Sequence, residues 1–147
     1  MAGRKKRFEF LEHTADLYIA AYGRSLEEAF ENAAYAMFEG MTDLENVESR
    51  LEDTVEAEGQ DEQALLYNWL EALLIKFDVT GNLYSRFKID AIKKTAGGFK
   101  LKAKIWGEPF DSEKHLSKVG IKAVTYHQME ILRNAKGAVT VRVILDI

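Results

Sequence analysis

The sequence predicts an α+β fold in which two main helices pack on one face of a mixed β-sheet, within a single domain. Two stretches carry apolar residues at helical spacing, and several others alternate or run apolar as strands do. The predicted order is strand, helix, strand, helix and then four strands, an order typical of α+β proteins. At 147 residues the chain is long enough to bury one core, so we treat residues 1–147 as one domain.

Composition narrows the class of protein. Hydrophobic residues make up 47% of the chain and charged residues 30%, as in ordinary globular proteins. The chain has no cysteine, which excludes disulfides and thiolate metal sites. No apolar run is long enough to span a membrane, and no apolar core of a secretory signal follows the basic residues Arg4 to Arg7. We therefore expect a cytoplasmic protein with no membrane partner, and a flexible basic tail over residues 1–7.

The first predicted strand is the apolar run from Leu17 to Tyr22, which Gly23 ends. Ser25 then begins a helix with a capping box, because Glu28 follows three residues later. This helix is expected to end at Gly40. One of its faces is apolar and is expected to pack inward: Leu26, Ala29, Phe30, Ala33, Ala34, Met37 and Phe38.

A strand is expected next, from Asn46 or Leu51 to about Glu58, with its acids on one solvated face. The second helix is expected from Gln60 or Asp61 to about Val79, with Asp61 as its N-cap. Its broad apolar stripe should be the main contribution to the core, and Tyr67 and Trp69 are interpreted as core residues rather than base-stacking platforms. The stripe comprises Leu65, Leu66, Trp69, Leu70, Leu73, Leu74 and Phe77.

Strands are predicted over most of the second half. Residues 83–95 and 99–106 should form a glycine hairpin, in which Lys100, Lys102 and Lys104 share one face. These lysines could contact RNA phosphates, but lysine is also common on solvated sheets. Residues 107–111 are expected to break the sheet. Residues 120–131 should form a strand with His127 toward the buried side, and residues 138–147 the last strand.

Acidic groups stand near the two opposite ends of the chain, and we interpret them as two halves of one site. Asp16 ends a polar run, residues 12–16, directly before the first buried strand, and Asp146 precedes Ile147. Hard divalent cations such as Ca²⁺ or Mg²⁺ take carboxylate oxygens, which Asp16, Asp146 and the carboxylate of Ile147 would supply. Phosphate-binding loops, nucleophile elbows and the zinc motif HExxH are absent. The residues alone therefore predict a carboxylate metal site and no particular reaction.

Three separated motifs resemble the archease family. They are Phe-Leu-Glu-His-Thr-Ala-Asp at residues 10–16, Lys-Ala-Val-Thr-Tyr-His at residues 122–127, and Val-Ile-Leu-Asp-Ile at residues 143–147. Residues 107–111 and the helix around residues 66–74 also resemble the corresponding segments of that family. The likeness covers essentially the whole chain, and the order of the three motifs makes it specific.

The resemblance implies an accessory protein and not a self-sufficient enzyme. Archeases assist the tRNA-splicing ligase that joins RNA ends bearing a 2′,3′-cyclic phosphate or 3′-phosphate to a 5′-hydroxyl. They promote guanylylation of the ligase by GTP and allow multiple turnovers, so GTP and tRNA would be engaged through the ligase.

The resemblance also implies a metal site made by Asp16, Asp146 and Ile147, holding a divalent cation. Ca²⁺ is the expected ion, with Mg²⁺ or Mn²⁺ as alternatives. Three further residues are candidates to support the metal or to act on the partner: His13, Lys122 and His127.

Two other functions remain open at this point. A chaperone-like or RNA-modification scaffold would bind partners through a helical face or through Lys100, Lys102 and Lys104. A metal-dependent hydrolase would turn over substrate without any partner.

Overall fold

The structure is a computed structural model that describes residues 6–12 and 16–147. His13 and Thr14 therefore lie outside the described residues. In chain order the elements are β1 (Phe8–Leu11), β2 (Asp16–Gly23), α1 (Leu26–Met41), the 3₁₀ turn η1 (Leu44–Asn46), β3 (Leu51–Gly59), α2 (Glu62–Thr80), β4 (Asn82–Thr95), β5 (Gly98–Pro109), β6 (Ala123–Val124), β7 (Glu130–Arg133) and β8 (Val139–Asp146).

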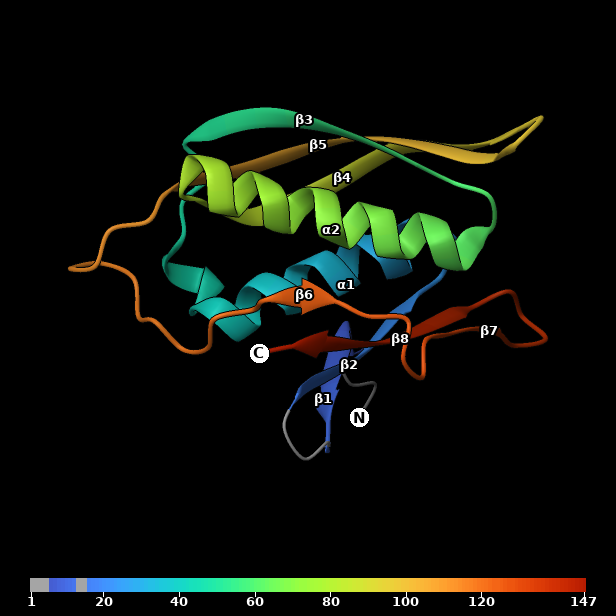
Figure 1. Cartoon of the computed structure of the whole chain (residues 1–147), viewed down its shortest axis with the longest axis horizontal. Helices are drawn as coiled ribbons and strands as arrows, with labels where there is room; N and C mark the ends of the chain where they lie inside the picture. Colours follow the sequence, from blue (N-terminus) through green and yellow to red (C-terminus); the bar gives the residue numbers. More distant parts are fainter. Residues whose placement is uncertain (1–5, 13–15) are drawn as a thin grey trace.

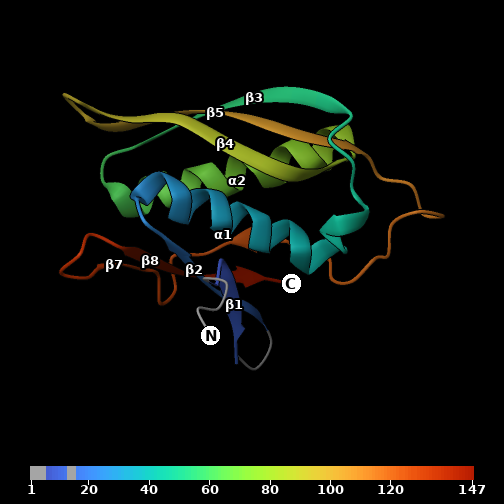
Figure 2. The same cartoon turned by 180° about the vertical axis from the view of Figure 1, so that it is seen from behind.

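The elements form three layers, with both helices between two β-sheets (Figures 1 and 2). The larger sheet has the order β1-β2-β8-β6, with β7 also paired to β8, and the smaller has the order β3-β5-β4. The α+β class in one domain is confirmed. The expectation of one mixed sheet is wrong, because there are two sheets and every strand pair in them is antiparallel.

Helix α1 explains why a second sheet is needed. Its predicted apolar face is fully buried except for Leu26, which is half-buried, and Ala36 and Met41, outside that face, are buried as well. A helix that is apolar almost all round must be covered on both sides. Its N-cap is as predicted, since Ser25 Oγ accepts a hydrogen bond from the Glu28 N–H at 3.1 Å. Gly40 does not end the helix: it lies within it, where a Cβ would come 2.6 Å from a Leu17 methyl group.

Helix α2 has the predicted bounds, and its apolar stripe is buried except for Phe77, which is half-buried against the core, as is Tyr67. Asp61 Oδ1 accepts a hydrogen bond from the Ala64 N–H at 2.7 Å, and Gly81 ends the helix in a left-handed conformation with φ of 76°. Trp69 is fully buried and donates its indole N–H to the Phe30 carbonyl at 3.0 Å, so it is a core residue. None of the helices in the described part of the chain is both long and apolar enough to cross a membrane.

Residues 120–131 do not form the single strand expected from their alternation. Only Ala123–Val124 pair with β8 as β6, and β7 begins at Glu130. The segment between them turns at Tyr126, whose carbonyl accepts the Met129 N–H at 3.1 Å, and Gln128 has a positive φ of 53°. His127 is consequently exposed in a turn, and its expected place toward the buried face is wrong.

The predicted sheet break at residues 107–111 is also wrong, because β5 continues to Pro109. Gly107 is buried beside an irregularity of β4, where the pairing register shifts between Tyr84 and Arg86. A Cβ at Gly107 would lie 1.8 Å from the Leu83 carbonyl oxygen. Glycine is required here for the close approach of two backbones, not for a turn.

Replacing Gly107 should therefore destabilise the protein much more than replacing a glycine at the hairpin tip. We expect Gly107→Ala to lower the free energy of unfolding by at least about 2 kcal/mol, because the backbone contact must open. The matched control is Gly97→Ala, where a Cβ meets no atom within 4 Å. Urea denaturation of both variants measures the difference, and equal midpoints would contradict this account of Gly107.

Candidate functional site

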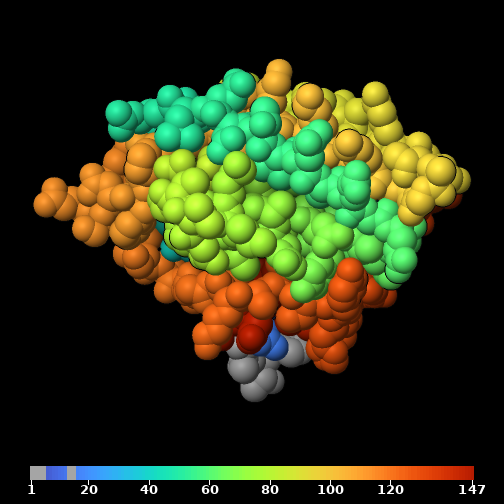
Figure 3. Space-filling view, turned by 45° about the horizontal axis from the view of Figure 1, so that its top comes forward, coloured from blue at the N-terminus to red at the C-terminus, as the bar shows by residue number. Residues whose placement is uncertain are grey.

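The pairing of β2 with β8 places Asp16 directly opposite Asp146. Directly opposed residues of an antiparallel pair have their side chains on the same face of the sheet. The neighbouring residues Leu17 and Leu145 pack into the core, so the two carboxylates belong to the other, outward face. Figure 3 shows the red C-terminal residues at the surface beside blue residues of the N-terminal strands.

Strand β6 adds the third motif to the same corner. Ala123 pairs with Asp146, and the Lys122 N–H donates to the Asp146 carbonyl at 2.7 Å. The Lys122 side chain is exposed, and Ile147 is half-buried with its side chain against the core. Asp16, Lys122, Asp146 and Ile147 are thus brought together from three distant parts of the sequence.

Two carboxylates that face each other across a strand pair repel, and the repulsion is relieved when a cation lies between them. The donor set is made of carboxylate oxygens and suits a hard divalent cation. Among residues 6–12 and 16–147, no three His, Asp or Glu side chains form a group that could hold a metal ion. Ca²⁺ takes about six to eight oxygens, so a bound ion would need main-chain oxygens, water or a partner's groups as well.

Comparison with known proteins shows which family shares this fold and this corner. The model of the archease protein family matches residues 8–147, which include the Asp16, Lys122 and Asp146 corner. The chain belongs to the archease family. The protein archease of Sulfolobus acidocaldarius is 46% identical over 141 residues, which are 96% of this chain and 99% of that one. The protein archease of Pyrococcus abyssi is 46% identical over 142 residues, 97% of this chain and 99% of that one.

A solved structure confirms the archease architecture found here. The solution structure of Methanobacterium thermoautotrophicum protein 1598 superposes with a TM-score of 0.84 at 45% identity. The similarity covers 96% of this chain and 99% of that one. The three layers are therefore shared with that protein over nearly their whole length.

A buried ionic cluster, which sequence reasoning did not find, supports the segment that leads to Lys122 in this archease chain. Glu108 is 2% exposed and His115 3% exposed. The Glu108 carboxylate accepts hydrogen bonds from the Glu48 N–H at 2.9 Å and from His115 Nε2 at 3.0 Å, and the Lys114 ammonium lies 2.8 Å away. The Asp111 N–H donates to His115 Nδ1 at 2.9 Å, so the ring is neutral with its proton on Nε2.

The cluster holds Glu108 as a carboxylate. Burial raises the pKa of Glu108, but the hydrogen bonds from Lys114, Glu48 and His115 outweigh that effect and lower the pKa to about 2. Its partners lie before it in the sequence, at residue 48, and after it, at residues 114–115. No spacing rule connects these positions, so the sequence alone does not predict the cluster. The cluster anchors the start of the long segment from Phe110 to Lys122 against the end of β5.

Removing the Glu108 charge should destabilise the protein in a pH-dependent way. The lowered pKa means that its contribution is fully present above about pH 4.5 and is lost as the pH falls toward 2. We expect Glu108→Gln to cost about 2 kcal/mol at pH 7. The difference from wild type should shrink between pH 4.5 and pH 2, as measured by denaturant unfolding.

The control for this prediction is Glu113→Gln, at an exposed carboxylate of the same segment. Its unfolding free energy should match wild type at each pH. A constant deficit of Glu108→Gln down to pH 2 would contradict the electrostatic explanation.

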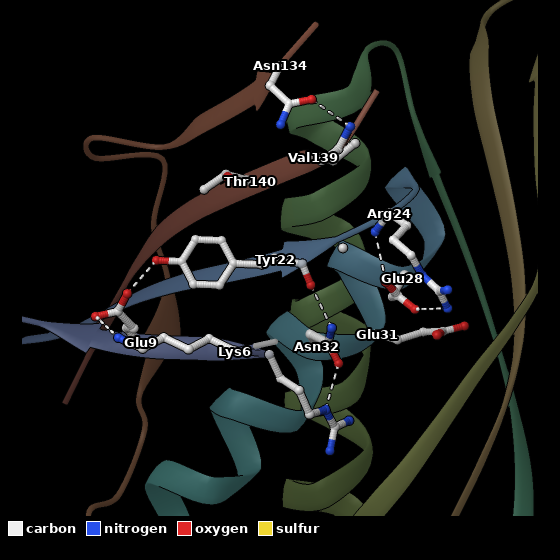
Figure 4. A pocket seen from close by; sticks show the side chains of 13 residues that line it. Lys6, Glu9, Tyr22, Arg24, Glu28, Glu31, Asn32, Asn134, Val139 and Thr140 are labelled. Carbon is white, nitrogen blue, oxygen red and sulfur yellow. Dashed lines mark hydrogen bonds and ion pairs between the residues drawn. The ribbon is translucent and has the colours of Figure 1, made fainter. Parts of the chain in front are cut away.

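A hollow of about 810 Å³ lies at the other end of the β2–β8 ladder (Figure 4). Its polar side chains bind one another: the Tyr22 hydroxyl donates to Glu9 at 2.8 Å, and Asn32 joins Arg7 Nε to the Tyr22 carbonyl. The bond from Tyr22 lowers the pKa of Glu9. Seven residue steps of about 3.4 Å separate Gly23 from Asp16, so this hollow is not part of the carboxylate corner. Arg7 at the edge of this hollow is held by its hydrogen bond to Asn32 and by Tyr35, whose ring centre lies 3.9 Å from the guanidinium.

Proposed function

We propose that this protein activates the tRNA-splicing RNA ligase and is not itself an enzyme. It would promote guanylylation of the ligase by GTP and multiple turnover, as the ligase joins 2′,3′-cyclic phosphate or 3′-phosphate ends to 5′-hydroxyl ends. Both proteins would act in the cytoplasm, with GTP and tRNA bound through the ligase. Membership of the archease family supports this proposal.

The observation that carries the proposal is the pairing of Asp16 with Asp146 at an exposed corner. These two side chains, with the main-chain carboxylate of Ile147, would hold a divalent cation, Ca²⁺ in the first instance and Mg²⁺ or Mn²⁺ as alternatives. A bound cation supplies positive charge that neutralises phosphate oxygens during nucleotidyl transfer. The exposed Lys122 beside Asp146 would add a second positive charge to orient a phosphate, with His13 and His127 as further candidates in the neighbouring segments.

A protein partner is supported by exposed apolar residues on the segment of the chain that leads to this corner. Phe110, Leu116, Val119 and Tyr126 are large and exposed, and all lie on the segment between β5 and the turn after β6. Phe110, Val119 and Ile121 line part of a hollow of about 260 Å³, and Ile121 directly precedes Lys122 in the sequence. Exposed apolar groups around a shallow hollow are typical of protein interfaces. The ligase would dock here with its nucleotide site facing the two carboxylates.

The decisive test is ligation with substoichiometric ligase, in the presence of Asp16→Ala or Asp146→Asn. Either substitution should abolish the stimulation, because one carboxylate alone binds a divalent cation weakly. Asp146→Asn should not lower the free energy of unfolding, because it removes a repulsion between like charges. Asp78→Asn, at an exposed acid of α2, is the matched control and should stimulate as wild type does.

Full stimulation by both site variants would contradict the proposal. Turnover of a phosphate ester by the isolated protein would favour the hydrolase. Loss of ligase stimulation on replacing Lys100, Lys102 and Lys104, while the Asp16 and Asp146 variants still stimulate, would favour the chaperone-like or RNA-modification scaffold.

Calcium binding can be tested without the ligase. Millimolar CaCl₂ should raise the melting temperature of wild type, because a ligand that binds only the folded state stabilises it. Asp146→Asn should show no such shift, and EDTA should reverse it in wild type. Equal shifts in both proteins would show that Ca²⁺ does not bind between these carboxylates, and MgCl₂ or MnCl₂ would then be compared in the same way.

A further inference from the structure

The outer face of the three-stranded sheet carries cations on both β4 and β5, interrupted on β4 by the exposed Asp90, where the pairing register shifts between Ile89 and Ala91. We call these six residues the basic strip: Arg86, Lys88, Lys93, Lys100, Lys102 and Lys104. All six are exposed, and the residues that alternate with them, such as Ile89 and Ala103, are buried. The sheet is the outermost layer on its side of the molecule, with the helices against its other face (Figure 1).

The strand register brings like charges together in the basic strip. Lys88 is directly opposite Lys104, and Lys93 is directly opposite Lys100. Like charges in directly opposed positions destabilise a sheet, by up to about 1 kcal/mol for each pair. Stability of the fold does not account for these two like-charged pairs, which lie on either side of the Ala91–Lys102 pair, whereas binding of an anion across them would.

Cations elsewhere in the described chain are mostly engaged by carboxylates. Examples are Lys76 with Asp53 at 3.0 Å and Lys118 with Glu39 at 2.8 Å. Within residues 6–12 and 16–147, the basic strip has one ion pair, between Lys100 and Glu58 at 3.9 Å. This holds even though the acids of β3 lie in the adjacent column and Glu56 directly opposes Lys102. The other strip ammonium groups are therefore available to an external anion.

The arrangement of the strip indicates the kind of anion. Residues two apart on a strand recur about every 7 Å, which is close to the separation of successive phosphates along an extended single strand. The acids of β3, Glu52, Glu56 and Glu58, would repel a polyanion from one side and keep it along β4 and β5. At the end of the strip the Arg86 guanidinium stacks 4.1 Å from the centre of the half-exposed Trp106 ring, and guanidinium planes as well as aromatic rings can stack on bases.

An acidic protein is a less suitable occupant than a nucleic acid. Stable protein interfaces are centred on buried apolar or aromatic anchors. The large exposed hydrophobic residues of the described chain all lie outside β3, β4 and β5: Phe10, Ile75, Val79, Phe110, Leu116, Val119, Tyr126 and Leu132. The strip thus offers charge and one half-exposed indole, as in sites that track a nucleic-acid backbone.

We propose that the basic strip binds the phosphate backbone of single-stranded RNA. The chemistry of the strip specifies a phosphodiester chain, and the choice of RNA rests on the proposed function. The strip lies on the opposite outer layer from Asp16 and Asp146 (Figures 1 and 2). The same molecule can therefore hold RNA on one side while its carboxylate corner faces a partner on the other.

The test is the binding of a fluorescein-labelled oligouridylate of about 20 nucleotides, followed by fluorescence anisotropy at several salt concentrations. Lys88→Gln, Lys93→Gln and Lys104→Gln are combined in one variant. We expect the Kd to rise about tenfold near 0.1 M salt, and the slope of log Kd against log salt to fall by about two, since each lost phosphate contact removes about 0.7. An oligoadenylate should show the same change, because backbone contacts carry no sequence information.

The control variant combines Lys6→Gln, Arg24→Gln and Lys136→Gln, three exposed cations outside the strip. It lowers the net charge by the same three units and should leave the Kd within about twofold of wild type. The proposal is overturned if both variants lose the same affinity, because binding would then follow net charge alone. It is also overturned if wild type does not bind RNA near 50 mM salt, which would leave an acidic protein as the occupant.

Trp106 offers a local measurement of the same event. It is half-exposed beside the strip, whereas the other tryptophan, Trp69, is fully buried. Unlabelled RNA should change the tryptophan emission of wild type, and Trp106→Phe should lose that response while its Kd by anisotropy stays within about threefold. A response that persists in Trp106→Phe would place the RNA elsewhere and contradict the proposal.

Failure here is distinguishable from failure of the proposed function. Asp146→Asn should bind RNA as wild type does while losing ligase stimulation. RNA binding through the strip without any stimulation of a ligase would contradict only the proposed function, and stimulation without RNA binding would contradict only this inference.

Discussion

The β2–β8 ladder is the contact on which both the core and the candidate site depend. It pairs the first long strand with the last one over eight residues, from Asp16 with Asp146 to Gly23 with Val139. Its inner side, including Ile19 and Val143, is fully buried against the helices. A slip of one residue would turn this apolar set outward, so burial of the core fixes the register. The same register sets the two carboxylates against each other on the outer face.

The three-layer arrangement gives the molecule two sheet faces that no helix covers. One carries the carboxylate corner and the other carries the basic strip, and both helices lie between them (Figures 1 and 2). The paired carboxylates and the basic strip thus lie on opposite sides of the molecule, whose net charge is −4. Such a separation allows a cation at the corner and a polyanion at the strip to be held apart on a rigid support.

The Glu108 cluster links the two sheets. Glu108 is at the end of β5, and its partners Lys114 and His115 belong to the segment that crosses to β6. A buried carboxylate is costly unless it is fully hydrogen-bonded, and here its bonds come from two separate parts of the chain, residue 48 and residues 114–115. The crossing segment is therefore anchored at its start by charge and at its end by the Lys122 main chain, through its bond to Asp146.

Local sequence determined the two helices, the Ser25 and Asp61 caps and the hairpin of β4 and β5, because apolar spacing and capping residues act over a few positions. The motifs around Asp16, Lys122 and Asp146 were also readable, and their meeting was inferred from resemblance. Only tertiary structure decided the second sheet, the broken strand around His127 and the partners of Glu108, since these depend on contacts between distant residues. The opposition of Lys88 to Lys104 is of the same kind: register is a property of the paired strands, and neither strand alone contains it.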